Sequence, residues 1–267
     1  MTGGGPGRRQ RLDRILVARG LAENGARARA LILAGRVRSE GRLLDKAGTR
    51  VPADIALTVA EGRRFVGRGA HKLLGALQAF RIEPAGVATL DVGASTGGFT
   101  QVLLEAGAAH VVALDVGKGQ LDWELRRDSR VTPLEGINAR HLTADGLPYR
   151  PTLAVIDVSF ISLELVLPAV ARVLAEDGEI VALVKPQFEV GRGKVGRGGI
   201  VREAALHREV LERLAEWCAG RGWTVAGVCR SPLAGADGNQ EFFLHILPGG
   251  GAAAPFTLDE VLGETSS

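Results

Sequence analysis

One stretch decides the fold: Leu90-Asp91-Val92-Gly93-Ala94-Ser95-Thr96-Gly97-Gly98-Phe99-Thr100, an apolar run that ends in a glycine-rich turn and leads into a helical pattern. Glycines let such a turn tighten, so that backbone N–H groups can approach a ligand at the start of the helix. The dinucleotide fingerprint is G-x-G-x-x-G, whereas this chain reads G-x-S-x-x-G. Ser95 therefore stands where a glycine would permit close approach to a pyrophosphate.

An acidic residue ends the next predicted strand. Asp115 lies 22 residues beyond Gly93, where a carboxylate can accept hydrogen bonds from ribose hydroxyls. An acidic second strand with an imperfect phosphate loop favours a nucleoside cofactor without phosphate, and we expect S-adenosylmethionine. Asn138, after the third strand, is expected to contact the adenine. The residues that we expect to bind this cofactor are Asp91, Gly93, Ala94, Ser95, Gly97, Gly98, Phe99, Asp115 and Asn138.

Apolar runs alternate with helical patterns over much of the chain. The runs are Val87–Val92, His110–Val116, Leu153–Val158, Ile180–Val184, Thr224–Cys229 and Glu241–Ile246. Helical periodicity in Gln101–Ala106 and Leu163–Leu174 predicts a mostly parallel, doubly wound α/β sheet. The last two runs have no helix between them, which predicts an antiparallel last strand. This detail favours the Rossmann-like sheet of S-adenosylmethionine-dependent methyltransferases over an ordinary dinucleotide fold.

The first fifty residues differ in charge from the rest. They contain twelve basic and four acidic residues, a net charge of +8, whereas the other 217 residues have a net charge of −5. Eleven of the twelve basic residues are arginine, whose forked guanidinium suits phosphate. A basic module beside a mildly acidic body indicates a polyanionic partner such as a nucleic acid. A solvated arginine-rich surface is the alternative interpretation.

Two short helices and a small sheet are predicted in this basic segment. Leu12, Ile15 and Leu16 form one helical stripe, and a second helix begins near Asn24 and stops at Gly35. Short apolar runs predict strands at Val37, Leu43-Leu44, Val51 and Ile55–Val59. The segment resembles the S-four RNA-binding domain, through Arg11-Leu12-Asp13 and Ala34-Gly35-Arg36-Val37. The resemblance implies an α+β domain that holds structured RNA through phosphates.

Four polar residues are candidates for chemistry because ligands of open α/β sheets bind beyond the carboxyl ends of the strands. Asp157 and Lys185 end two predicted strands, and Glu241 opens the antiparallel last strand at the same edge. Lys72 leads the helix that precedes the sheet. Structural carboxylates and an exposed helix lysine are the alternatives. A lysine directly after four apolar residues needs partners, because a buried unpaired charge is costly.

Several stretches together resemble the TlyA family, whose members are historically called hemolysins, and more distantly the FtsJ-type RNA 2′-O-methyltransferases. They are Gly67–Leu73, Asp91–Thr100, Asp157–Leu163, Val184–Val190, Gly191–Val201 and Gly238–Phe243. The resemblance implies methylation of a cytidine ribose in small-subunit rRNA, large-subunit rRNA or both. It also implies a Lys-Asp-Lys-Glu tetrad formed by Lys72, Asp157, Lys185 and Glu241. We hypothesise that neutral Lys185 accepts the 2′-hydroxyl proton while Asp157 fixes its amine.

A glycine-rich loop follows Lys185. Residues 191–199 contain five glycines and three cations, which predicts either a mobile strap against RNA phosphate or a flexible solvated loop. From this loop, the basic segment and the stretch before Lys72, we expect RNA contacts. The expected residues are Arg11, Arg14, Arg27, Arg29, Arg36, Arg38, Arg68, Arg192, Lys194 and Arg197.

Other classes of protein lack their sequence signals. No apolar run is long enough to cross a bilayer and no secretory signal is recognisable, so a cytoplasmic protein is expected. The five histidines show no metal-ligand spacing, and Cys218 and Cys229 form no C-x-x-C. The run Leu153–Val158 ends in Asp157-Val158 and continues as Ser159-Phe160, without the prolines typical of exocyclic-amine methylases. A cytolysin and a catalytically inactive ribosome-binding protein remain as alternative functions.

The expected organisation has five segments. They are a disordered tail at 1–10, an S-four-like RNA-binding domain at 11–60, a linker at 61–66, an FtsJ-like methyltransferase domain at 67–247 and a flexible tail at 248–267, with a possible helical turn at Leu258–Leu262.

Overall fold

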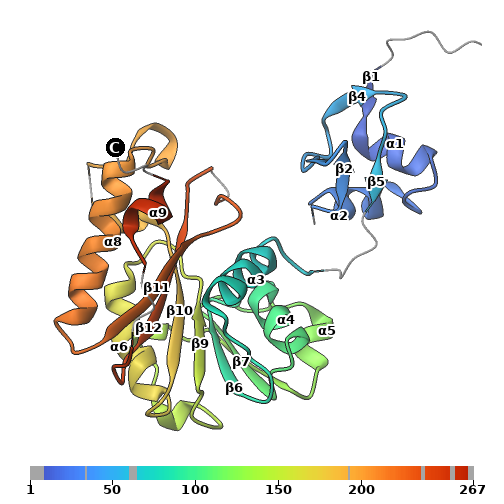
Figure 1. Ribbon diagram of the computed structural model, residues 1–267. Helices are drawn as coiled ribbons and strands as arrows, with labels where there is room; N and C mark the ends of the chain where they lie inside the picture. The colour runs from blue at the N-terminus through green and yellow to red at the C-terminus, as the bar shows by residue number, and fades with distance from the viewer. Residues whose placement is uncertain are drawn as a thin grey trace, which may run out of the picture. The chain divides into compact units, whose positions relative to one another are not determined.

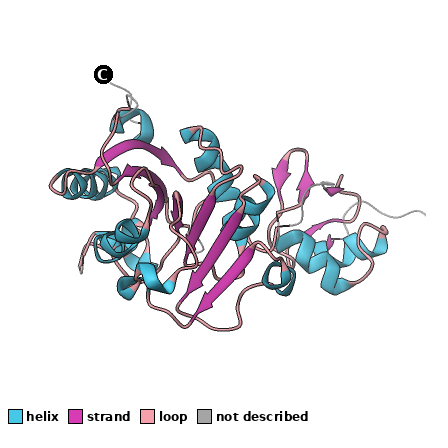
Figure 2. Ribbon diagram, turned by 90° about the horizontal axis from the view of Figure 1, so that it is seen from below, coloured by secondary structure: helices cyan, strands magenta, loops and turns pink. Residues whose placement is uncertain are grey.

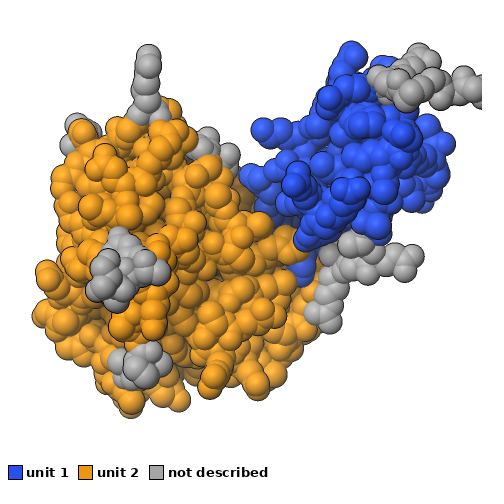
Figure 3. All heavy atoms as spheres, turned by 45° about the horizontal axis from the view of Figure 1, so that its top comes forward, with its two compact units in different colours: residues 1–68 blue, residues 69–267 orange. Residues whose placement is uncertain are grey.

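The computed structural model describes residues 9–33, 35–59, 65–191, 193–235, 238–252 and 256–263, without the side chains of Ala30 and Arg197. Most of the expected N-terminal tail, residues 61–64 of the expected linker, Ala34 and Arg192 lie outside these ranges. The chain divides into two compact units, residues 1–68 and residues 69–267 (Figure 3). Within the described residues, no helix is long and apolar enough to span a membrane.

The first unit is built around two short helices, α1 (Leu12–Ala18) and α2 (Gly25–Leu33). The apolar stripes of the two helices face each other and form a core of their own. Gly35 follows α2 with a φ of +67°, a left-handed conformation that ends the helix at little cost for glycine. The fully or nearly fully buried core residues of this unit are Leu12, Ile15, Leu16, Ala22, Ala28, Leu31, Ile32, Val37 and Val51.

Two small sheets, rather than the single sheet predicted, cover these helices. In one, β1 (Arg9–Arg11) pairs antiparallel with β4 (Arg50–Pro52). In the other, β2 (Val37–Ser39) lies between β3 (Arg42–Leu43) and β5 (Thr58–Val59). The sequence missed β1 because its residues, Arg-Gln-Arg, are all polar and only backbone pairing makes them a strand. The run predicted at 55–59 is a strand only at its last two residues.

The second unit contains one seven-stranded sheet with the order β11-β12-β10-β9-β6-β7-β8 (Figure 1). Its strands are β6 (Ala88–Val92), β7 (His110–Asp115), β8 (Val131–Glu135), β9 (Leu153–Ile156), β10 (Glu179–Val184), β11 (Thr224–Arg230) and β12 (Phe242–Leu247). All adjacent strands are parallel except β12, which is antiparallel to both β10 and β11. The predicted mostly parallel sheet with an antiparallel last strand is confirmed.

The apolar runs did not reveal β8, because its sequence Val-Thr-Pro-Leu-Glu is half polar and contains proline. It is an edge strand, pairing with β7 alone, and proline is tolerated at sheet edges. The run predicted at His110–Val116 ends at Asp115, and Val116 is 71% exposed.

Helices cover both faces of this sheet (Figure 2). They are α3 (Gly69–Phe80), α4 (Gly98–Glu105), α5 (Trp123–Arg127), α6 (Leu163–Val173), α7 (Pro186–Glu189), α8 (Ala204–Ala219) and α9 (Leu258–Leu262). In Figure 1, α6, α8 and α9 lie on one side of the sheet, and α3, α4 and α5 lie on the other. One large apolar cluster joins α6 and α8 to alternate residues of the strands, such as Leu90, Ala182 and Phe242.

The segment expected to be a flexible tail contains α9, at the residues named as a possible helical turn. Leu262 is 5% exposed and packs in the large cluster, and Arg230 donates a hydrogen bond to its carbonyl oxygen at 2.6 Å. Asp259 pairs with Arg208 on α8. A buried leucine and two arginine contacts therefore fix this part of the segment on the second unit.

Leu262→Ala should lower the free energy of unfolding by about 2–3 kcal/mol, the lower range for removing a buried leucine side chain. The residue is buried in the core cluster but lies on a short peripheral helix that can partly relax. Leu165→Ala on α6 is the matched control, since Leu165 is 52% exposed and should change stability by less than about 0.5 kcal/mol. Urea unfolding measures both; equal effects would contradict the role given to α9.

Candidate active site

Two lysine–carboxylate pairs lie at the carboxyl edge of the sheet. Lys185 Nζ is 2.6 Å from Asp157 Oδ1 and donates a hydrogen bond to Ser159 Oγ at 2.8 Å. Lys72 Nζ donates to Glu241 Oε2 at 2.5 Å. The side chains of Lys72 and Lys185 are 12% and 11% exposed, and that of Glu241 only 3%. Each nearly buried charge therefore has a partner, which offsets part of the cost of removing it from water.

The strand register brings the two pairs next to each other. Val184 pairs with Phe242, so Lys185 directly after one strand and Glu241 directly before the other are neighbours. The residue before Lys185, Val184, and the residue after Glu241, Phe242, belong to the α6–α8 cluster. Because side chains alternate between the faces of a strand, both charged residues lie on the α3 side. Lys72 is the fourth residue of α3 itself.

Asp157 reaches the same place from β9. Ile156 belongs to the α6–α8 cluster, so the next residue points to the α3 side of the sheet. A Cβ atom placed on Gly69, at the start of α3, would lie 3.8 Å from Asp157 Oδ2. The four candidates thus form two adjoining pairs between the start of α3 and the ends of β9, β10 and β12.

The glycine-rich turn is held tightly against this edge. Gly93 has a φ of +88°, and a Cβ atom there would lie 2.3 Å from the carbonyl oxygen of Asp157, so only glycine fits. Ser95, where the dinucleotide fingerprint has glycine, adopts a φ of +49°. Its backbone N–H donates to Asp115 Oδ2 at 2.8 Å, and that of Gly117 donates to Oδ1 at 2.6 Å. Ser95 therefore keeps a left-handed conformation without being glycine, and the two hydrogen bonds to Asp115 stabilise the turn.

Asp91 is the most buried acid at this edge. Thr100 Oγ1 donates to its Oδ2 at 2.7 Å, whereas Oδ1 is buried with no hydrogen-bond partner among the described residues. Burial raises the pKa of Asp91 to about 7, and the negative charges of Asp157 and Asp115 add to the increase. An unpaired buried carboxylate oxygen is where a cationic or hydrogen-bond-donating ligand group would gain most.

The other expected cofactor residues lie in different surroundings. A Cβ atom on Gly97 would lie 2.3 Å from the Leu125 side chain, so this glycine is needed for packing against α5. Phe99 is buried against Phe243, with ring centroids 6.3 Å apart. Asn138 is exposed and accepts a hydrogen bond from the backbone of Arg140 at 3.1 Å. Ala94 and Gly98 are buried at the start of α4.

Sequence reasoning gave no role to Ser159 and Phe160, the residues after Asp157. Ser159 is the hydrogen-bond partner of Lys185, and Phe160 is 90% exposed with a φ of +63°, a costly conformation for an aromatic residue. The ring of Phe160 lies 4.9 Å from that of Phe188 on α7. A serine and an aromatic residue directly after an acid that ends a strand were the available signal.

The glycine-rich loop is anchored at its far end by Asn239, which is 1% exposed. Its side chain donates to the carbonyl oxygen of Gly199 and accepts from the N–H of Val201, both at 2.9 Å. Lys194 pairs with Glu209 on α8. Arg192 and the side chain of Arg197 lie outside the described parts of the chain.

The basic residues of the first unit have different environments. Arg11 is bound by Asp13 through two hydrogen bonds of 3.0 and 2.8 Å, and Arg38 donates to the carbonyl oxygen of Gly41 at 3.1 Å. Arg14 and Arg29 are exposed on α1 and α2. The remaining expected RNA contacts are half-buried at Arg27 and Arg36 and exposed at Arg68.

Within the described ranges, the two cysteines are not activated and the potential metal ligands do not cluster. Burial raises the pKa of both Cys218 and Cys229 to about 11, which keeps them as neutral thiols. No group of three or more potential metal ligands is present among the described residues.

The sheet order with β12 inserted between β10 and β11, the tight turn after β6 and the acid ending β7 define a Rossmann-like methyltransferase. Comparison with known families agrees. The FtsJ-like methyltransferase profile matches residues 65–246, and that of the S4 (S-four) domain matches residues 10–54.

Individual relatives narrow the class. The 16S/23S rRNA (cytidine-2'-O)-methyltransferase TlyA of Mycobacterium tuberculosis is 53% identical over 241 residues, 90% of each chain. The 23S rRNA (cytidine-2'-O)-methyltransferase TlyA of Campylobacter jejuni is 34% identical and covers 73% of this chain and 78% of its own. A hemolysin-named structure from Streptococcus thermophilus has a TM-score of 0.74 and 40% identity, covering 96% of this chain and 95% of that chain. The chain belongs to the TlyA family of FtsJ-like methyltransferases, which confirms the family predicted from sequence.

Asp91 should give the unliganded protein a pH-dependent stability. The pKa in the folded state is about 7, above the ordinary 3.8, so the folded protein binds this proton more tightly than the unfolded chain. The free energy of unfolding should therefore fall as the pH rises through this interval, by about 1.4 kcal/mol per pKa unit. Asp91→Asn, whose amide oxygen still accepts from Thr100, should remove this fall.

Urea unfolding between pH 5 and pH 8 measures the slope. Asp145→Asn is the control, because Asp145 is exposed and its replacement should leave the slope as in the wild type. An Asp91→Asn protein with the wild-type slope would show that Asp91 is charged in the folded state throughout this range.

Proposed function

We propose that this protein transfers the methyl group of S-adenosylmethionine to the 2′-hydroxyl of a cytidine in ribosomal RNA. The observation that carries the proposal is the meeting of two lysine–carboxylate pairs at the edge of a methyltransferase sheet. The names of the M. tuberculosis and C. jejuni relatives give the same reaction for those proteins.

The residues present fit this cofactor. Asp91 lies one residue before the end of β6, Asp115 ends β7 and Asp157 follows β9. The effect of the Asp157 and Asp115 charges on the pKa of Asp91 indicates an electronegative edge. Such an edge attracts a ligand with a sulfonium and an ammonium group, and repels the pyrophosphate of a dinucleotide. Bound S-adenosylmethionine supplies an electrophilic methyl group.

Distinct parts of the edge would hold different parts of the cofactor. The unpaired Oδ1 of Asp91 suits the ammonium group, and Asp115 keeps lone pairs for ribose hydroxyls besides its two backbone donors. The turn that would hold the cofactor is formed by Gly93, Ala94 and Ser95, and the exposed amide of Asn138 would be available to the adenine. The turn would be supported by the start of α4, at Gly97, Gly98 and Phe99.

The two ion pairs divide the catalytic work. Lys185, once it has released the proton that it carries in the ion pair, would take the proton of the 2′-hydroxyl as that oxygen bonds to the methyl carbon. The bond between this carbon and the sulfonium sulfur would break, which leaves a neutral thioether and an ammonium group at Lys185. Asp157 and Ser159 hold the amine in one orientation. Lys72 and Glu241 orient the ribose and keep the local charge balanced. Alignment of the hydroxyl with the methyl group provides much of the acceleration of an in-line displacement.

The exposed ring of Phe160 supports a nucleotide substrate. RNA-modifying enzymes unstack their target base and commonly stack it on aromatic side chains. Phe160 extends from the loop after Asp157 and is backed by Phe188, so one face can receive a base while the ribose reaches Lys185. Its positive φ is a strain of the kind that persists at functional sites.

The first unit supplies a basic surface for rRNA. Exposed arginines on both of its helices suit phosphate contacts that fix orientation without reading sequence. The glycine-rich loop follows Lys185 in the chain and would add three further cations, Arg192, Lys194 and Arg197. The relatives differ in their named substrate, so whether one or both ribosomal subunits are modified is decided by mapping ribose methylation in cells with and without the gene.

Two other functions are distinguished by experiment. The hemolysin name of the S. thermophilus structure favours a membrane-active protein, and a ribosome-binding protein without catalysis would use the first unit alone. Calorimetric titration of S-adenosylmethionine, followed by tritium transfer to rRNA and isolated subunits, separates these from the proposed reaction.

Lys185→Ala should lower single-turnover methyl transfer by 100-fold or more, on the order of the contribution of one general base. Lys185→Arg keeps a cation beside Asp157 but cannot accept a proton, so it should be equally impaired. Both variants should bind S-adenosylmethionine as the wild type does, measured by calorimetry. Near-normal turnover in the alanine variant would refute the role, and activity in the arginine variant alone would assign Lys185 to orientation instead.

Replacing Arg14 and Arg29 together by alanine should weaken rRNA binding and make it less dependent on salt. Loss of two phosphate contacts lowers the slope of log K against log salt by roughly 1–2. Filter binding between low and physiological salt measures this, with Arg172→Ala on the exposed face of α6 as the control. An unchanged slope would exclude these two arginines from the RNA interface.

A further inference from the structure

Glu189 is a buried carboxylate outside the two ion pairs, and it joins the segment that follows Lys185 to the segment that follows Asp157. Glu189 ends α7, the four-residue helix that begins directly after Lys185, and its side chain is 2% exposed. Oε1 accepts from the backbone N–H of Leu163 at 2.8 Å. Oε2 accepts from Ser162 Oγ at 2.8 Å and from Arg213 Nη2 at 3.0 Å. Glu189 thus receives three donors from two other helices.

Two of these donors belong to the start of α6. Ser162 is the N-cap of that helix and Leu163 is its first residue, so Glu189 takes up an N–H group that has no partner within the helix. The five residues before Ser162 form the loop that begins with Asp157 and carries Phe160. One side chain therefore fastens the segment after Lys185 to the segment after Asp157.

The link to Lys185 is short and hydrogen-bonded. The N–H of Phe188 donates to the carbonyl oxygen of Lys185 at 2.9 Å, and that of Val190 donates to the carbonyl oxygen of Pro186 at 3.0 Å. A shift of Glu189 therefore moves the backbone of Lys185. The contact between Phe160 and Phe188 spans the same junction.

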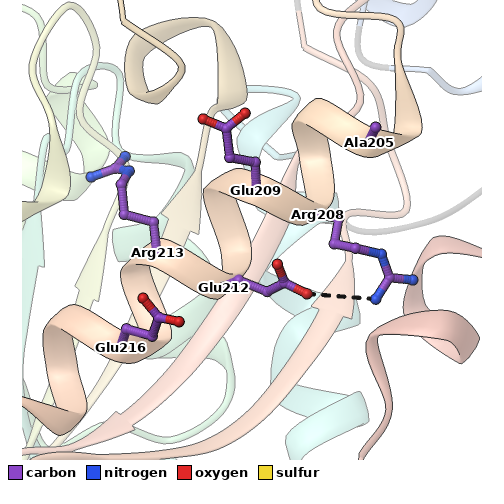
Figure 4. Close-up of a pocket in the computed structure, with 6 residues that line it drawn as sticks. All are labelled: Ala205, Arg208, Glu209, Glu212, Arg213 and Glu216. Carbon is purple, nitrogen blue, oxygen red and sulfur yellow. Dashed lines mark ion pairs between the residues drawn. The ribbon is translucent and has the colours of Figure 1, made fainter.

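The site requires an ionised carboxylate. All three partners donate, and an amide in place of the carboxylate would turn a donor toward one of them. Burial raises the pKa of Glu189, which is the cost of placing a charge here. Arg213 supplies the counter-charge, and it also donates to the backbone carbonyl oxygen of Glu189 at 3.1 Å and pairs with Glu164. Figure 4 shows Arg213 extending from α8 away from the Arg208–Glu212 pair.

A carboxylate on β10, Glu179, offers a comparison with Glu189. Glu179 begins the strand, at the edge opposite Lys185, and pairs with His245 at 2.6 Å. It is also partly buried, at 30% exposed, and also joins two elements. This contact stabilises the end of the sheet opposite Lys185. Among the described residues, it does not involve the loops that support the two ion pairs.

We propose that Glu189 is a positioning residue for methyl transfer: by locking α7 to the start of α6, it fixes the Lys185 amine relative to Asp157 and Ser159. This inference rests on the proposed function. It predicts an effect on the rate of the chemical step that exceeds any effect on cofactor binding or on stability, because a displacement near 1 Å at a reacting group lowers rates by as much as about 100-fold.

The test compares Glu189→Gln on α7 with Glu179→Gln at the start of β10, the same chemical change on either side of Lys185 in the chain. Under saturating S-adenosylmethionine and rRNA, Glu189→Gln should lower the single-turnover rate by about 10- to 100-fold. Its cofactor dissociation constant, from calorimetry, should equal that of the wild type. Glu179→Gln should keep the wild-type rate even where its midpoint of thermal unfolding falls. Equal rates in the two variants would overturn the proposal.

A double-mutant cycle tests the route of the effect. If Glu189 acts through the Lys185 amine, Ser159→Ala combined with Glu189→Gln should be slowed by less than the product of the two single effects. Strict additivity would overturn the proposal. Ser162→Ala removes one donor to Glu189 and keeps the carboxylate, so it should show a smaller loss of rate. It replaces Glu189→Gln in the cycle if that variant fails to fold.

A spectroscopic measurement separates this inference from the proposed function. The Lys185 ammonium signal in ¹⁵N NMR, assigned with Lys185→Arg, should shift in Glu189→Gln and stay unchanged in Glu179→Gln. This result does not require methyl transfer. An inactive wild type would refute the proposed reaction while the NMR comparison still decides whether Glu189 positions Lys185.

Discussion

Charge pairing at the carboxyl edge of the sheet constrains everything around it. Two ammonium groups and the carboxylate of Glu241 lie nearly out of water, and each would be too costly there without its partner; Asp157, the fourth group, is 23% exposed. The pairs come from four segments of the chain: the Lys185–Asp157 pair needs β9 and β10 in register, and the Lys72–Glu241 pair needs α3 beside the start of β12. The antiparallel insertion of β12 satisfies this requirement, because it brings the acid that precedes the strand back to the edge where the parallel strands end.

The same edge holds two unfavourable features. Asp91 keeps an unpaired buried oxygen, whose cost a bound cation would relieve, and Phe160 has a left-handed backbone. Each is a local cost that the well-packed sheet supports. The cluster of α6 and α8 with alternate strand residues is fully apolar, and it leaves the polar residues of the strand ends to the α3 side. Because apolar side chains fill one face of the sheet, the polar side chains at the strand ends lie on the other face, where the candidate active site is.

Much of this arrangement could be predicted from sequence, and the remainder depends on contacts that sequence does not display. Apolar runs followed directly by Asp157 and Lys185 identify strand ends, and the missing helix before the last run identifies an antiparallel strand. By contrast, β1 is made of Arg-Gln-Arg and exists only through backbone pairing with β4. The bond from Lys185 to Ser159 and the one from Glu189 to Leu163 each join residues 26 positions apart. Their formation depends on loop conformations, including the positive φ of Phe160, for which the chain carries no local pattern.

The position of β12 has a consequence for biosynthesis. As the last strand of the sheet, it is synthesised after every other strand, yet it lies inside the sheet between β10 and β11. A nascent chain that has not yet released residues 241–247 from the ribosome holds Lys72 without its carboxylate and a sheet split into two pieces. Assembly of the Lys72–Glu241 pair is therefore delayed until residues 241–247 have left the ribosome, and a chain truncated before this strand would keep the first unit and lose the edge where the four charged groups meet.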